Sequence, residues 1–180
     1  MTTRIALLAL AAAVAFTPHV PADDVPAPSP KKVQSVVEKA YDYLKSQQGA
    51  DGSFSPKVAG PGVTAIVVAG LLRNGYGPND PVVAKALTYL ESMAKKDGGI
   101  YDKGLANYTT SVAVMALEEA NRGGRYNSLL KNAVTFLKKL QYGGDEGNVK
   151  FGGVGYDAKS RPDLSNTQFF LDAMLAAGVP

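Results

Sequence analysis

The sequence predicts an all-α protein built from helical hairpins that repeat along the chain. An alanine followed three residues later by an aromatic residue and then a leucine occurs three times, ending at Leu44, Leu90 and Leu137. These leucines are 46 and 47 residues apart, and each block is followed by a glycine-rich loop and a second apolar segment. A period of this length is typical of stacked hairpins, in which each unit buries its apolar face against its neighbours.

The first 22 residues are predicted to be a signal peptide. A short basic start precedes the apolar run Ile5–Phe16, and Val20-Pro21-Ala22 supplies the small residues of a cleavage site. That run is much shorter than the roughly 20 residues that span a bilayer, although an uncleaved anchor is the alternative. We therefore expect export to the periplasm or the exterior, a proline-rich linker over residues 23–30 and the repeat domain over residues 31–180.

The composition argues against several classes of catalytic and binding site. The chain has no cysteine, and its one histidine is His19, inside the predicted signal. A mature chain without thiol or imidazole lacks the usual nucleophile, general base and zinc ligands, so we expect no metal and no cofactor. The net charge is only +3 and the basic residues form no dense run, which argues against nucleic acid as a partner.

The first helix of each hairpin is predicted over residues 31–48, 81–95 and 126–141. Apolar side chains recur there at steps of three and four, which indicates one buried stripe and one solvated face. In the first of these helices the stripe contains Val37, Ala40, Tyr43 and Leu44. We therefore expect Tyr43 to be buried, like the aromatic residues that match it in the other two repeats.

The second helices are predicted over residues 62–74, 108–121 and 165–177. They are apolar on most sides, so each is expected to be buried among other helices or to line an apolar cavity. Short polar residues near their starts suit N-caps. These candidate caps are Thr64, Asn107, Thr109, Ser165, Asn166 and Thr167.

The first repeat resembles the QW motif of squalene–hopene and oxidosqualene cyclases. After Lys39-Ala40, the motif residues are Tyr43-Leu44, Gln48, Gly52 and Phe54, with Phe54 in place of the motif's tryptophan. The third repeat keeps Gln141 and a glycine pair, Gly152-Gly153. The resemblance is to the prenyltransferase/squalene oxidase repeat family of the terpenoid cyclase and protein prenyltransferase superfamily. It implies an α/α toroid whose motif residues tie neighbouring hairpins together, with an apolar cavity inside the ring.

Three hairpins would form only part of such a ring, which the resemblance places at roughly six. The last hairpin is expected to leave apolar side chains facing water, which predicts self-association or covering by further repeats of a longer chain. These side chains are Phe169, Phe170, Leu171, Met174 and Leu175.

The start of the last helix resembles the segment that carries the catalytic acid of squalene–hopene cyclase. Asp163 matches the first aspartate and Thr167 the threonine, but Ser165 and Asn166 stand where the family has the acid and the next aspartate. A serine hydroxyl is not acidic enough to protonate an alkene, so Asp163 is the remaining catalytic candidate. Zinc-dependent protein prenyltransferases are disfavoured because the mature chain has no cysteine or histidine.

Two functions follow as expectations. One is a terpene cyclase-like or prenyltransferase-like enzyme acting on an isoprenoid, and the other is a secreted, non-catalytic module that binds a hydrophobic ligand, a glycan or a protein. Candidates for lining the cavity are the polar and aromatic side chains at the starts of the second helices. They are Thr64, Tyr108, Thr110, Asn166, Thr167 and Gln168.

Overall fold

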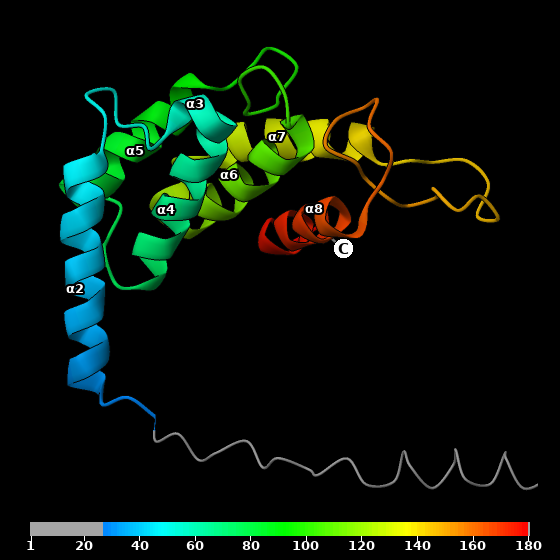
Figure 1. Ribbon diagram of the computed structural model, residues 1–180. Helices are drawn as coiled ribbons and strands as arrows, with labels where there is room; N and C mark the ends of the chain where they lie inside the picture. The colour runs from blue at the N-terminus through cyan, green and yellow to red at the C-terminus, as the bar shows by residue number, and fades with distance from the viewer. Residues whose placement is uncertain (1–26, 180) are drawn as a thin grey trace, which may run out of the picture. The chain divides into compact units, whose positions relative to one another are not determined.

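The computed structural model describes residues 27–179 and confirms the all-α class (Figure 1). The predicted signal peptide and the first part of the predicted linker lie outside the described residues. The chain divides into two compact units between Val36 and Val37, and the packing below is that of the second unit. In the described residues, no helix combines the length and the apolar character needed to cross a bilayer.

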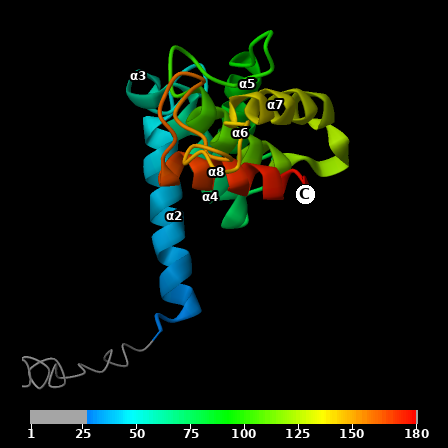
Figure 2. The same cartoon turned by 90° about the vertical axis from the view of Figure 1, so that its right-hand side faces the viewer.

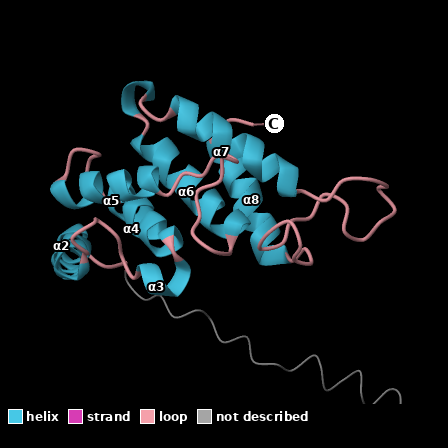
Figure 3. Cartoon of the chain, turned by 90° about the horizontal axis from the view of Figure 1, so that it is seen from above, coloured by secondary structure: helices cyan, strands magenta, loops and turns pink. Residues whose placement is uncertain are grey.

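All six predicted helices are present, with ends close to the expected positions. The first helices of the hairpins are α2 (Pro30–Gln47), α5 (Pro81–Ser92) and α7 (Asn127–Leu140), and the second are α4 (Pro61–Arg73), α6 (Ala106–Ala120) and α8 (Leu164–Ala176). The short helices α3 (Pro56–Ala59) and η2 (Arg122–Gly124) lie in connections. Within the described chain there is no strand, only an isolated bridge between Ala94 and Ile100 (Figure 3).

The second helices pack against one another, and α5 and α7 cover them. Helix α6 lies between α4 and α8, α5 packs on α4, and α7 packs on α6. In Figure 2, α5 and α7 lie above α4 and α8, with α6 between the two levels. Each covering helix therefore lies against the inner helix that precedes it in the chain, which makes α4, α6 and α8 one inner row.

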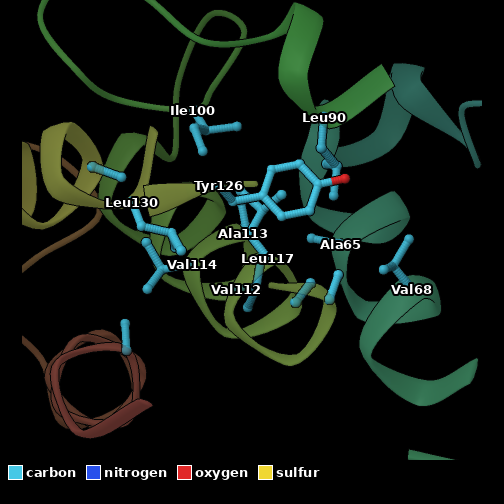
Figure 4. Close-up of a cluster of buried hydrophobic side chains, with 14 of the residues drawn as sticks. Ala65, Val68, Leu90, Ile100, Val112, Ala113, Val114, Leu117, Tyr126 and Leu130 are labelled. Atoms are coloured by element: carbon cyan, nitrogen blue, oxygen red, sulfur yellow. The ribbon is translucent and has the colours of Figure 1, made fainter. Parts of the chain in front are cut away.

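The core is centred on α6. Its Val114 and Leu117 are fully buried, and they meet Leu90 of α5 and Leu130 of α7 in the cluster drawn in Figure 4. Proline at the first turn of α4 and of α5 suits helix starts, because that position needs no N–H donor. The expectation that a helix apolar on most sides is buried among other helices is confirmed for α6.

The expected burial of the α2 stripe is wrong for Ala40 and Tyr43, whereas Leu44 is partly buried against the core. Tyr43 is 65% exposed, whereas the matching Tyr89 of α5 is 9% exposed. The reason is that α5 packs on an inner helix that precedes it, while no inner helix precedes α2 in the described residues. Tyr41 packs beside Leu44. Its ring stacks on Tyr76 with centroids 4.2 Å apart, and its hydroxyl donates to the Asp80 carboxylate at 2.9 Å.

The last hairpin is covered only in part. Leu171 and Leu175 of α8 face water, as expected from the sequence. Phe170 and Met174 are buried, which corrects the expectation for those two side chains, because they turn toward the core formed with α6 and α7. Phe169 is half-buried and packs edge-on against Tyr108.

Candidate functional site

Each glycine-rich loop is held to the following inner helix by a threonine. A backbone N–H near the end of the loop donates to the threonine hydroxyl in all three repeats. The pairs are Phe54 with Thr64 at 2.9 Å, Ile100 with Thr110 at 2.9 Å and Val154 with Thr167 at 3.1 Å. Thr64 and Thr110 are fully buried. The structure therefore places these three candidate cavity residues at loop-to-helix junctions, where their hydroxyls satisfy backbone groups.

The QW-like residues join one hairpin to the next. The amide Nε2 of Gln48 donates to the carbonyl of Gly52 at 3.1 Å and to that of Val82, in the first turn of α5, at 2.9 Å. Gly52 has φ of 92°, and a Cβ there would lie 2.3 Å from the carbonyl oxygen of Lys85. Only glycine permits so close an approach of two backbones. Phe54 is buried beside this junction.

Asp163 caps α8. One of its carboxylate oxygens accepts the Asn166 backbone N–H at 2.8 Å and the Ser165 hydroxyl at 2.7 Å, and the other accepts Asn166 Nδ2 at 2.8 Å. The expected caps at Ser165, Asn166 or Thr167 were wrong by a few residues, because the carboxylate of Asp163 occupies that position. These hydrogen bonds, led by the Asn166 backbone N–H, lower the pKa of Asp163. The group is therefore a carboxylate at neutral pH.

A groove of about 370 Å³ opens between the starts of α6 and α8. Tyr108 and Phe169 form its aromatic floor, with ring centroids 4.9 Å apart in an edge-to-face arrangement. Of the candidate cavity residues, only Tyr108 and Asn166 line this groove. Its complete lining is Leu105, Tyr108, Tyr156, Ser165, Asn166 and Phe169.

Gln168 stays outside the groove, because its side chain is exposed and Nε2 donates to Asp172 at 2.8 Å within α8. Asp163 is also absent from the lining and reaches the groove only through its bonds to Ser165 and Asn166. Gln141 lies at the start of the third glycine-rich loop, away from the groove. Its Nε2 donates to the Gly152 carbonyl at 3.0 Å.

Asn166, one of the residues that line the groove, carries a buried acceptor without a hydrogen bond. The residue is 1% exposed, and its backbone carbonyl accepts Asn107 Nδ2 at 3.2 Å. Its Nδ2 must face the Asp163 carboxylate, which fixes the orientation of the amide and leaves Oδ1 with no partner among the described residues. A buried acceptor without a hydrogen bond costs about 1–3 kcal/mol, so a ligand donor that reached this oxygen would recover that cost.

Leu105, also in the groove wall, has a strained backbone. Its φ of 54° and ψ of 33° place a non-glycine residue in the left-handed region, immediately before α6. A leucine there costs on the order of 1 kcal/mol or more, and such strain often lies at functional sites. Sequence reasoning missed Leu105, because its strain appears only in the backbone geometry.

Among the described residues, no three carboxylates gather closely enough to hold a metal ion. No protein-family model matches the chain, and no curated protein shows significant sequence similarity to it. The resemblance to cyclase-type repeats therefore stays a prediction from the motif residues.

Proposed function

We propose that this protein is an exported repeat module of the prenyltransferase/squalene cyclase type that binds a hydrophobic small molecule without converting it. The groove between α6 and α8 supports this proposal, and the observation that carries it is the unpartnered Oδ1 of Asn166 beside an aromatic floor. Aromatic faces suit an apolar chain, and a lone acceptor suits a ligand with one hydroxyl donor. An isoprenoid alcohol has both features.

Binding is favoured over cyclisation by the state of the acidic group. Cyclase-type initiation needs a protonated carboxyl group that delivers its proton to an alkene. The hydrogen bonds to Asp163 lower its pKa and keep it ionised at neutral pH. The Ser165 hydroxyl is already engaged with Asp163 at 2.7 Å. Neither group is prepared to donate a proton into the groove.

A hydrophobic ligand is favoured over a glycan by the composition of the groove. Four of its six lining residues, Leu105, Tyr108, Tyr156 and Phe169, are apolar or aromatic. A sugar requires several convergent polar partners, whereas Asn166 supplies one free acceptor. That oxygen is buried, so a ligand reaches it only when side chains of the groove lining move.

Calorimetric titration with farnesol and with farnesyl methyl ether tests the proposal. The two probes share the chain, but only the alcohol can donate to Asn166 Oδ1, so we expect the ether to bind about tenfold more weakly. Tyr156→Ala should weaken farnesol binding by a similar factor. Phe151→Ala is the matched control, since Phe151 is 43% exposed against 44% for Tyr156 and lies outside the groove.

Equal affinity for the two probes, or equal loss in the two variants, would contradict the proposed site. Circular dichroism of each variant separates a binding defect from a folding defect. Incubation with squalene and analysis of the products tests the enzymatic alternative. A cyclised product that disappears in Asp163→Asn would show that the chain is a catalyst.

A further inference from the structure

The three glycine-rich loops differ in what lies against them. A Cβ on Gly52 would lie 2.3 Å from the Lys85 carbonyl of α5, and one on Gly98 would lie 2.5 Å from the Asn132 carbonyl of α7. Gly152 has the same left-handed backbone, with φ of 75°, but no described atom lies within 4 Å of its Cβ position. The third loop thus has the shape that accepts an outer helix, and no described helix occupies it.

The glutamines show the same difference. Gln48 bonds the carbonyl of its own loop glycine and also the carbonyl of Val82 in the following outer helix. Gln141 makes the first of these bonds, to Gly152, and its side chain is exposed. The acceptor that Gln141 lacks is the first-turn carbonyl of a following outer helix.

The surface of α8 is open at the matching place. In the two complete junctions an outer helix packs on the preceding inner helix, α5 on α4 and α7 on α6. On α8 the corresponding region is an apolar groove of about 480 Å³. Within it Leu175 is 77% exposed and Leu171 is 51% exposed. The groove is bordered by Lys138 and Gln141.

Helix α2 is an outer helix whose inner-facing side is covered only in part, at Leu44. Its Lys39-Ala40 and Tyr43-Leu44 repeat the spacing of Lys85-Ala86 and Tyr89-Leu90. In α5 the alanine and the tyrosine are buried, whereas Ala40 and Tyr43 of α2 are exposed. One chain therefore carries both surfaces of such a junction, the open groove on α8 and the exposed face of α2. The same type of junction already forms twice within the chain.

We propose that the α8 groove and the Gly152 loop of one copy bind α2 of a second copy, head to tail. The internal junctions predict the register, with the Lys39 carbonyl of the second copy against Gly152 and Tyr43 of that copy over Leu171 and Leu175. The two surfaces are different, so the contact is heterologous and generates a closed ring or an extended chain of copies.

Sedimentation equilibrium of the full chain over a range of concentrations tests the association. We expect the average molecular mass to rise with protein concentration. We also expect Leu175→Glu and Tyr43→Glu each to weaken association by about tenfold or more, because each places a charge in an apolar contact. Val58→Glu is the matched control, since Val58 is 80% exposed but lies in α3, outside the proposed contact. A chain that stays monomeric throughout, or a control that dissociates equally, overturns the proposal.

Cross-linking tests the direction of the contact. The chain contains no cysteine, so Phe151→Cys and Lys39→Cys each introduce a single thiol, beside Gly152 and on α2. When the two variants are mixed and treated with a short bismaleimide, head-to-tail docking should yield mainly the mixed dimer. Dimers that form mainly within each variant alone indicate a face-to-face contact and overturn the proposal.

Discussion

The hairpin junctions and the groove at the starts of α6 and α8 differ in how well their polar groups are satisfied. At the junctions, the Gln48 amide and the Thr64 and Thr110 hydroxyls all have backbone partners. At the groove, Leu105 is strained and Asn166 Oδ1 has no partner in the described chain. The polar groups named at the junctions are therefore satisfied, whereas the groove combines backbone strain with an unsatisfied acceptor, as functional sites often do.

The largest effect is expected where two backbones touch. Gly98→Ala puts a Cβ 2.5 Å from the Asn132 carbonyl at a φ of 99°, so both sterics and conformation oppose it. We expect the free energy of unfolding to fall by roughly 2–4 kcal/mol, measured by urea denaturation. Gly143→Ala, with no described atom within 4 Å of its Cβ, is the control. Similar losses in both variants would remove the special role of the junction.

A smaller loss is expected from Thr110→Val. The change keeps the shape of the side chain but leaves the buried N–H of Ile100 without its 2.9 Å acceptor. The expected cost is about 1–3 kcal/mol, again from urea denaturation. Thr135→Val is the comparison, because Thr135 is exposed and its hydroxyl bonds only the Lys131 carbonyl. Equal stability of Thr110→Val and the parent would show that the threonine bond is dispensable.

Lowering the pH should remove the stabilisation that the Asp163 cap gives to the fold. Its folded-state pKa is lowered from the ordinary 3.8, so the cap stabilises the fold above that value and the contribution disappears as pH falls through the folded-state pKa. Asp163→Asn should therefore be less stable than the parent at neutral pH, with the difference shrinking in acid. Thermal unfolding followed by circular dichroism across this range measures it, and a difference that is constant with pH would contradict the assignment.

The smallest change in stability is expected at Leu105. In Leu105→Gly the relief of about 1 kcal/mol of backbone strain offsets the lost side-chain contacts, so the free energy of unfolding should stay level or rise slightly. Farnesol binding should weaken, because Leu105 forms part of the groove wall. If stability falls by well over 1 kcal/mol while binding is unchanged, Leu105 belongs with the junction residues and not with the site.

The sequence predicted the helices well because their apolar spacing is a local property. It failed for Tyr43, since the buried face of α2 depends on a neighbour that the spacing does not reveal. Of its cavity candidates, Tyr108 and Asn166 line the groove, whereas Thr64 and Thr110 have hydroxyls that bond to the loops. The strain at Leu105 and the free oxygen of Asn166 depend on three-dimensional geometry, so no pattern of residue types could have shown them.

The stacked pair Tyr41 and Tyr76 gives the molecule an optical signal for the attachment of α2. Burial and the hydrogen bond to Asp80 raise the pKa of Tyr41 to about 12, from an ordinary 10.0. Between these values Tyr41 keeps its proton only while α2 stays in place, so release of the helix should appear as new phenolate absorbance. With no tryptophan in the chain, the difference between the parent and Tyr41→Phe would follow this event without any added label.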